Sequence, residues 1–323
     1  MIRAVFRGIR RLAAKRRRRG APIILMYHRV ADLPVDPWAL AVHPTRFDEQ
    51  IDMLSQTRRV VHLHELLSKQ IHRRSDKPLA AVTFDDGYYD VYCNARSVLH
   101  RYDCPATLFV TTGAIGSGRE FWWDALAGIF LEKQELPRDC SVTIGATRRQ
   151  WTIPTFADRT GRDRIYREVW SSLRTVPFEI RNRCLEQIAN WADFSLTARP
   201  LHRAMTAQEV ADTDDELVTI GTHTTNHPSL PELPFAMQFR EIADSRKACE
   251  DIVNRAVTSF AYPFGDHDEE TVRAVREAGL TLACTTIPDV VLRNADPLRL
   301  PRLNVGNWPA DEFLRHIEGC PFS

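Results

Sequence analysis

The segment Leu79–Gly87, LAAVTFDDG, decides how the rest of the chain is interpreted. Its apolar run predicts a buried strand, and Gly87 predicts a sharp turn after it, because glycine adopts backbone angles that other residues avoid. Asp85 and Asp86 stand between the strand and the turn. Two buried carboxylates repel each other and lose hydration. A metal ion would relieve this cost, with one carboxylate as its ligand and the other free to act as a base.

A second apolar segment offers the further ligands that a metal would need. Leu217–Thr224, LVTIGTHT, predicts another buried strand, and it runs into His223 and His227. Histidines four residues apart can face the same way on one helical turn. Two neutral imidazoles and one carboxylate make three protein ligands and leave a fourth position for water or substrate, as in catalytic zinc sites.

These motifs resemble the polysaccharide deacetylases of the NodB-homology type, carbohydrate esterase family 4. The resemblance rests on Thr83–Gly87, TFDDG, together with the H-x-x-x-H spacing of the two histidines. Phe260–Gly265, FAYPFG, resembles the third motif of the family. Met26–Val30, MYHRV, resembles the opening strand of the exopolysaccharide and poly-N-acetylglucosamine deacetylase branch. The resemblance covers residues 22–313 apart from a middle insertion, and it implies a distorted (β/α)7 barrel.

The resemblance also implies roles for particular side chains. Asp86, His223 and His227 would hold one divalent metal, with Zn2+ as the preferred candidate. Asp85 would be the general base that takes a proton from the attacking water. The expected reaction removes N-acetyl groups from an amino sugar in a polysaccharide, an oligosaccharide or a lipid-linked glycan. The metal and the backbone N–H of Tyr262 would stabilise the oxyanion.

Two departures from the family pattern require substitutes. The last strand, Leu300–Val305, lacks the late histidine that protonates the leaving amine. We expect His28, on the first strand across the barrel seam, to be the general acid; the alternative is that it only hydrogen-bonds the backbone beneath the site. The third motif has Ala261 where many members have an arginine that orients the base. Arg302 is the expected replacement, and Arg29 is the weaker alternative.

Substrate contacts are expected from three residues. Tyr262 and Pro263 belong to the third motif, and Trp122 stands with Trp123 near the start of the middle insertion. Aromatic faces suit pyranose rings, so Trp122 is interpreted as a sugar-stacking platform at the barrel rim. The alternative is that the tryptophan pair forms the core of the insertion.

Strands alternate with helices along most of the chain, which predicts a parallel sheet, and the number of repeats favours a closed barrel. We assign residues 1–20 to a basic tail or amphipathic segment and residues 21–323 to the barrel. The alternation breaks at about residues 116–205, which we interpret as a mostly helical insertion on the rim. Helices are predicted there near residues 123–133, 162–173 and 178–191, and a hairpin or strand over 148–153.

Charge limits the classes of partner. The 323 residues include 43 basic and 42 acidic side chains, but nine basic ones lie in the first twenty residues, where there is no acidic residue. The remainder, with 34 basic and 42 acidic residues, does not have the charge of a nucleic-acid binder. The basic segment predicts peripheral contact with an anionic membrane, or else a solvated tail.

Location follows from the same sequence features. The basic segment lacks the apolar core of a signal peptide, and the chain has no run of about 18 apolar residues that would span a membrane. We therefore expect a cytoplasmic protein, with contact to the inner membrane face as the option that the basic segment allows.

Two other functions remain open from the sequence. The same scaffold could hydrolyse another non-peptide C–N amide, because variable loops set the substrate pocket. A non-catalytic barrel that binds glycan is the other alternative, and the missing late histidine and third-motif arginine favour it. The intact pair of carboxylates and pair of histidines argue against a pure binder, which has no need of a free base beside a metal.

Overall fold

The structure is a computed structural model, and it describes residues 20–68, 71 and 75–319. The basic segment at residues 1–19, with the membrane contact predicted for it, lies outside the described residues. In the part of the chain that is described, every helix is too short or too polar to cross a membrane.

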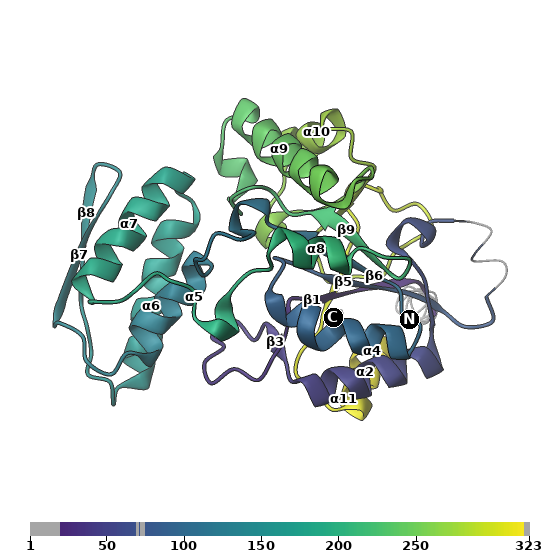
Figure 1. The fold of residues 1–323 in the computed structure, drawn as a ribbon, viewed down its shortest axis with the longest axis horizontal. Coiled ribbons are helices and arrows are strands. Elements are labelled where there is room, and N and C mark those ends of the chain that lie inside the picture. Colours follow the sequence, from purple (N-terminus) through teal and green to yellow (C-terminus); the bar gives the residue numbers. More distant parts are fainter. Residues whose placement is uncertain (1–19, 69–70, 72–74, 320–323) are drawn as a thin grey trace, which may run out of the picture.

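A parallel sheet forms the centre of the molecule (Figure 1). Among the described residues it has eight strands: seven follow the order β11-β10-β9-β6-β5-β1-β12, and β4 pairs with β5 off this path. Their bounds are β1 Ile23–Tyr27, β4 Arg59–Val60, β5 Leu79–Phe84, β6 Ala106–Val110, β9 Val218–Thr222, β10 Ser259–Ala261, β11 Leu282–Cys284 and β12 Leu303–Asn304. A parallel bridge between Cys284 and Leu300 joins β11 to the segment that enters β12. The sheet therefore curls into the predicted distorted barrel.

The central strand β5 shows how the sequence makes this barrel. All six of its residues are buried. Ala80, Val82 and Phe84 pack with the apolar side chains of the surrounding helices. Leu79 and Ala81 belong to a second cluster that includes side chains from β1, β6, β10 and β11. Alternate side chains of a strand point to opposite faces, so a strand covered on both faces reads as a continuous apolar run.

Helices cover the outside of the sheet (Figure 1). α2, α4 and α11 lie together on one side, and α9 and α10 lie on another. In α2, Phe47, Ile51 and Leu54 are buried at the three- and four-residue spacing of one helical face. The bounds are α2 Pro44–Thr57, α4 Arg96–Arg101, α8 Ala207–Thr213, α9 Phe235–Val253, α10 Glu269–Glu277 and α11 Ala310–Gly319. A short parallel pair, β2 Arg29–Val30 and β3 Ala41–Val42, follows β1.

Residues 116–205, which we call the insertion lobe, contain helices at the predicted places. They are α5 Trp122–Ala127 with a π-helical turn Gly128–Glu132, α6 Arg159–Arg174 and α7 Phe178–Trp191. β7 Asp139–Ile144 and β8 Thr147–Thr152 pair antiparallel, so the predicted strand is one half of a longer hairpin. The lobe has its own hydrophobic cluster and projects to the left of the barrel in Figure 1.

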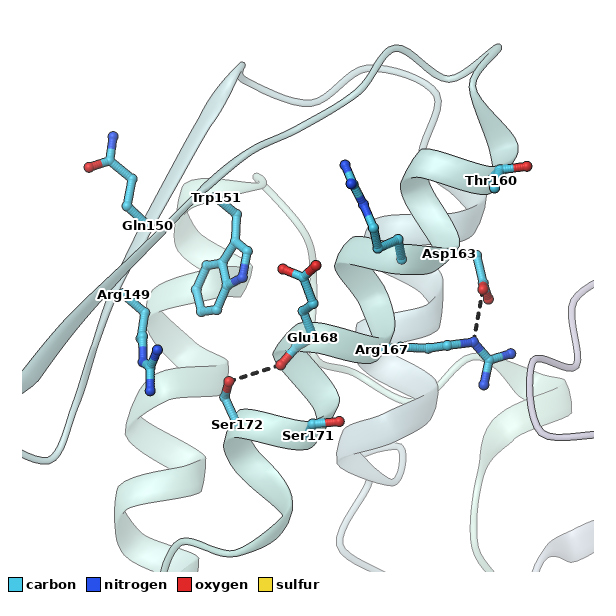
Figure 2. Close-up of a pocket in the computed structure, with 10 residues that line it drawn as sticks. Arg149, Gln150, Trp151, Thr160, Asp163, Arg167, Glu168, Ser171 and Ser172 are labelled. Carbon is cyan, nitrogen blue, oxygen red and sulfur yellow. Dashed lines mark hydrogen bonds and ion pairs between the residues drawn. The ribbon is translucent and has the colours of Figure 1, made fainter.

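An open groove of about 710 Å³ lies on the insertion lobe between β8 and α6 (Figure 2). Its lining is polar and charged around Trp151, and includes Arg149, Arg164 and Glu168. Ser172 donates to the backbone carbonyl of Glu168 on one wall. All of the lining residues belong to the lobe, so the groove is a feature of the insertion and not of the barrel.

Candidate active site

Three candidate metal ligands meet at the carboxyl ends of β5 and β9, where parallel barrels carry their reacting groups. Asp86 follows β5, while His223 and His227 follow β9. One ligand atom from each lies within 4.8 Å of the others. Oδ1 of Asp86 is 3.6 Å from Nε2 of His223 and 3.4 Å from Nε2 of His227. The three side chains are buried, with exposed fractions of 2%, 2% and 6%.

The backbone around this cluster has unusual dihedral angles. Asp86, Thr224 and His227 have φ of 75°, 67° and 51°. Such angles are rare and costly for residues with a β-carbon, and they persist where the surrounding structure imposes them. Gly87 has φ of 90°, and a β-carbon there would lie 3.1 Å from Val110, which explains the glycine. The two histidines are brought together by this irregular loop, so the expected helical turn is wrong.

Hydrogen bonding sets the state of the two imidazoles. Nδ1 of His223 lies 2.7 Å from the carbonyl oxygen of Ala261 and must carry the proton to donate to it. Its Nε2 is then free to bind a cation, which is the usual arrangement around a metal-binding histidine. Nδ1 of His227 is buried without a hydrogen-bond partner in the described structure. Burial lowers the pKa of both imidazoles, which keeps them neutral as metal ligation requires.

The carboxylate of the cluster fits the same interpretation. Burial, and then the charge of Asp85, raise the pKa of Asp86 well above its ordinary value. A cation beside Asp86 would oppose that shift, because its charge stabilises the ionised carboxylate. Two imidazole nitrogens and one carboxylate oxygen suit a divalent ion such as zinc. The residues present therefore fit a metal.

Asp85 is held by an arginine from the last strand region. Nη1 and Nη2 of Arg302 donate to its two carboxylate oxygens, each at 2.7 Å. The same guanidinium donates to Thr83 and to the carbonyl of Thr285, and the side chain is fully buried. Burial raises the pKa of Asp85, but the charge and hydrogen bonds of Arg302, together with the charges of His223 and His28, outweigh burial and lower the pKa to about 2. The alternative partner, Arg29, pairs with Asp90 at 2.9 Å, so that alternative is wrong.

His28 lies at the carboxyl end of β1, which pairs with β5 on one side and β12 on the other. Burial lowers its pKa to about 4, while the charge of Asp85 opposes that shift and Arg302 adds to it. The charges that act on His28 thus include the base Asp85, its partner Arg302 and the candidate ligand His223. It is partly exposed, unlike the other candidate residues of the cluster. The hydrogen bonds of the described residues include none from its ring, which argues against a role in anchoring the backbone.

The position of Tyr262 contradicts two predictions, that its N–H stabilises the oxyanion and that its side chain contacts substrate. Its N–H donates to the carbonyl of Cys284 at 3.0 Å, so it is not available to an oxyanion. Its side chain is fully buried against the α9 and α10 layer, and its hydroxyl donates to the carbonyl of Leu298 at 2.8 Å. Tyr262 therefore supports the barrel wall and does not contact substrate. Pro263, the next residue, is also buried.

Trp122 lies in the core of the insertion lobe. Its exposed fraction is 6%. Its ring stacks on Trp170 with centroids 5.9 Å apart and meets the edge of Trp123. The guanidinium of Arg181 lies 5.2 Å from its centroid. This environment favours the core alternative over a platform on which a sugar could stack.

The sequence interpretation missed three residues that surround His227. The rings of Trp123 and Phe264 lie 4.8 Å and 4.5 Å from the imidazole. Arg181 donates to the carbonyl oxygen of His227. Trp123 stood beside a residue already singled out, and Phe264 lies inside the third motif. Arg181 had no local signal, because nothing near it in the sequence indicates a contact with a loop 46 residues further along.

Hydrogen bonds also connect the lobe to the loop that carries the two carboxylates. Trp123 Nε1 donates to the hydroxyl of Tyr88 at 2.8 Å, and that hydroxyl donates to Asp124 at 2.6 Å. The guanidinium of Arg29 lies 4.2 Å from the centre of the Tyr88 ring. The lobe is thus attached to the active-site end of the barrel on both the Asp86 side and the His227 side.

The fold is a parallel β/α barrel, and a candidate metal site lies at the carboxyl ends of its strands, where enzymes with such barrels have their active sites. The sequence profile described as polysaccharide deacetylase matches residues 72–136 and 188–283. The chain belongs to the polysaccharide deacetylase family. The gap in the match, residues 137–187, covers the hairpin, α6 and the first part of α7.

Individual relatives agree with this assignment. YxkH of Bacillus subtilis, which is named as a polysaccharide deacetylase, is 29% identical over 115 residues, 35% of this chain. The chain spans only 41% of the length of that relative. The Streptococcus pyogenes deacetylase PplD has a TM-score of 0.59 at 18% identity, covering 92% of this chain and 98% of its own. IcaB from Ammonifex degensii has a TM-score of 0.58 at 18% identity, covering 94% and 97%. These likenesses concern the fold.

Proposed function

We propose that this protein is a metal-dependent hydrolase that removes N-acetyl groups from an amino sugar in a polysaccharide, an oligosaccharide or a lipid-linked glycan. The observation that carries the proposal is the buried cluster of one carboxylate and two imidazoles beside a second carboxylate that is not part of it. Family membership supports deacetylation of a carbohydrate. The amino sugar and the size of the glycan are set by loops that carry no recognisable motif.

Asp86, His223 and His227 would hold the metal, and zinc is the preferred ion because the donors are two imidazoles and a carboxylate. A bound divalent ion would supply Lewis acidity to the acetyl carbonyl and to a water molecule. The protein contributes neutral imidazoles, one of them fixed in orientation by the carbonyl of Ala261. It also contributes a buried site from which bulk water is largely excluded.

Asp85 is proposed as the general base. Its low pKa keeps it ionised at neutral pH, so the carboxylate is unprotonated when the attacking water approaches. Each carboxylate oxygen has two lone pairs, and Arg302 uses one on each. The remaining lone pairs can accept a hydrogen bond from water. Arg302 fixes the plane of the carboxylate and so determines where the base points.

His28 is proposed as the general acid. Hydrolysis adds a hydroxyl group to the acyl carbon, breaks the C–N bond, and requires a proton on the leaving nitrogen. A pKa of about 4 means that His28 is neutral before the reaction, so it must first receive a proton. The proton that Asp85 takes from water is a suitable source, because Asp85 with a pKa of about 2 gives up a proton more readily than His28 with a pKa of about 4. Acetate and a free amine are the products.

The test is acetate release from N-acetylglucosamine oligomers by purified protein of measured metal content, with Asp85→Asn as control. Metal-dependent release that the substitution abolishes would support the reaction and the base. A metal-loaded protein that released no acetate would favour hydrolysis of a different amide. A protein that bound no metal under any loading condition would contradict the proposal and favour a barrel that only binds glycan.

We also propose that residues 1–20 contact the anionic inner face of the cytoplasmic membrane, since nine basic residues and no acidic one occur there. Such a position would suit a lipid-linked glycan. Deletion of the residues before Ala21 should move the protein from the membrane fraction to the supernatant. Unchanged partitioning would contradict the contact.

A further inference from the structure

The loop that carries His223 and His227 has an unusual set of supports. Its backbone N–H groups at Thr225 and Asn226 donate to the carboxylate of Glu241, at 3.1 Å and 2.8 Å. The side-chain amide of Asn226 donates to the same carboxylate at 2.7 Å. Helix α9 therefore holds the backbone N–H groups of the loop through one acidic residue.

The carbonyl side of the loop is held from two places. The carbonyl oxygens of Thr224 and Thr225 accept hydrogen bonds from the backbone N–H groups of Thr112 and Gly113, at 3.1 Å and 2.8 Å. These donors come from the barrel loop after β6. The next two carbonyls, those of Asn226 and His227, accept from one guanidinium, that of Arg181.

Arg181 comes from the insertion lobe. It lies in the first turn of α7, is 2% exposed, and its Nη1 is 3.2 Å from the carbonyl oxygen of His227. The aromatic ring of Trp122 lies beside it. Burial lowers its pKa to about 10, so it remains charged at neutral pH. It stands in the part of the chain that the family profile does not match.

We propose that Arg181 is a positioning residue that holds His227 in its metal-binding orientation, so that the insertion lobe completes the metal site. This inference rests on the metal site of the proposed function. Without the guanidinium, the buried carbonyl of His227 and the partly buried carbonyl of Asn226 would lose their donor, and buried polar groups are rarely left unpaired. His227 has φ of 51°, an angle that the loop keeps only while its surroundings impose it. A relaxed loop would turn the imidazole away from Asp86.

The first experiment compares zinc affinity in Arg181→Met and in the matched control Arg183→Met. Arg183 is an exposed arginine on the same helix. Zinc would be removed from the full-length protein with a chelator and titrated back against a chromophoric competitor. We expect Arg181→Met to bind zinc about 10- to 100-fold more weakly, the range for lost outer partners of metal ligands. Arg183→Met should bind like the wild type.

Further readouts separate positioning from a general loss of structure. Far-UV circular dichroism and thermal unfolding of the zinc-free proteins should show that Arg181→Met is folded. If Arg181→Met is not folded, Arg181→Lys is used instead. It should bind zinc several-fold more weakly, because an ammonium group replaces the planar guanidinium that donates to two carbonyl oxygens. Excess zinc should restore the kcat of acetate release, with KM for the glycan unchanged.

Several results would overturn the inference. A folded Arg181→Met with wild-type zinc affinity would do so, as would a wild-type affinity in Arg181→Lys where that variant is needed. Zinc affinity is measured without substrate, so it is independent of the reaction. Zinc binding that depends on Arg181 in a protein that releases no acetate would support positioning and contradict the proposed activity. A wild-type protein that bound no zinc would contradict both.

Discussion

The candidate site has a metal side, Asp86 with His223 and His227, and a base side, Asp85 with Arg302, and the two handle charge in opposite ways. On the base side, burial raises the pKa of Asp85, but the charge of Arg302, supported by the charge of His223 and by the hydrogen bonds from Arg302, lowers it to about 2. On the metal side, burial and Asp85 raise the pKa of Asp86, and burial keeps the imidazoles neutral.

Asp85 and Asp86 are adjacent in the chain, and their different surroundings shift their pKa values in opposite directions. On the base side, the negative charge of Asp85 is balanced within the protein, because the buried Arg302 forms an ion pair with it. The metal side has three ligand atoms and no positive charge of its own, so a cation would complete it. The predictions below test this difference, beginning with the change that should have the largest effect.

The largest effect is expected from His223→Ala on the metal side. Loss of one of three ligands should remove zinc and lower acetate release by about 1,000-fold or more, because a metal supplies several kcal/mol of stabilisation to the transition state. Zinc content by elemental analysis and initial rates would measure both. His100→Ala, an exposed histidine on α4, should leave both unchanged. Full zinc occupancy in His223→Ala would show that the metal side is defined wrongly.

Much of this arrangement could be predicted from local patterns. Apolar runs marked the strands, and the acidic and histidine motifs that follow them indicated what lies at their carboxyl ends. Arg302 could be predicted as the partner of Asp85 from its place in the last strand and from the family resemblance, since similar deacetylases carry an arginine there. The fold therefore follows from chain order, while the ion pair of Asp85 with Arg302 also required the family resemblance.

Local sequence patterns led to a wrong prediction for Tyr262 and gave none for Arg181. Strand alternation would have corrected Tyr262: Phe260 and Tyr262 pack on the outer face, while Ala261 between them faces the barrel interior. Arg181 is different, because its contact depends on how the insertion lobe docks on the barrel. That docking is a tertiary property of many residues, and the sequence around α7 predicts only an amphipathic helix.

Asp85→Asn should separate the two sides. The general base would be lost, so kcat should fall by about 100- to 10,000-fold, the usual contribution of a positioned base. Zinc affinity should be retained, since the metal side keeps all of its ligands. Rates with zinc-saturated protein and a parallel zinc titration would measure this. Asp85→Asn that failed to bind zinc would mean that the two carboxylates act as one unit.

His28→Ala tests whether the base side includes an acid. We expect kcat to fall by about 100-fold, the low end of the range for general acids, because His28 is partly exposed and water can replace it in part. Zinc content should not change. The comparison should be made with N-acetylated glycan and with an aryl acetate, whose leaving group needs no proton. An equal loss on both substrates would argue against proton donation to the amine.

Arg302→Met should leave the carboxylate of Asp85 buried without its positive partner, as the carboxylate of Asp86 is on the metal side. Burial without the arginine favours the neutral carboxyl, so the pKa of Asp85 should rise and the acid limb of the kcat/KM profile should move to higher pH. We expect a loss of about 10- to 100-fold in kcat near neutral pH, because the base is no longer oriented. Arg29→Met, which removes the other buried arginine nearby, should leave the acid limb in place. An unmoved limb in Arg302→Met would contradict the role of the arginine.

The stability of the metal-free protein should also distinguish the two sides, because they should respond to pH with opposite signs. The pKa of Asp85 is about 2 in the folded protein and has an ordinary value of 3.8, so the unfolded chain binds the proton more tightly. Its stabilising contribution is present above pH 4 and is lost as the pH falls toward 2. The pKa of Asp86 is raised, so its contribution is greatest below 3.8 and is lost as the pH rises through the folded pKa.

Urea unfolding of metal-free protein from pH 3 to pH 8 would measure both signs. At neutral pH, Asp86→Asn should raise the free energy of unfolding by about 1–3 kcal/mol, because it removes a buried charge that lacks a partner. Asp85→Asn should lower it by about 3–5 kcal/mol, since Arg302 would then be a buried charge without its partner. Saturating zinc should reverse the first effect, because the metal stabilises only a protein that keeps its carboxylate ligand. If both substitutions changed stability in the same direction without metal, the two sides would not differ in charge compensation, and the case for a cation site would weaken.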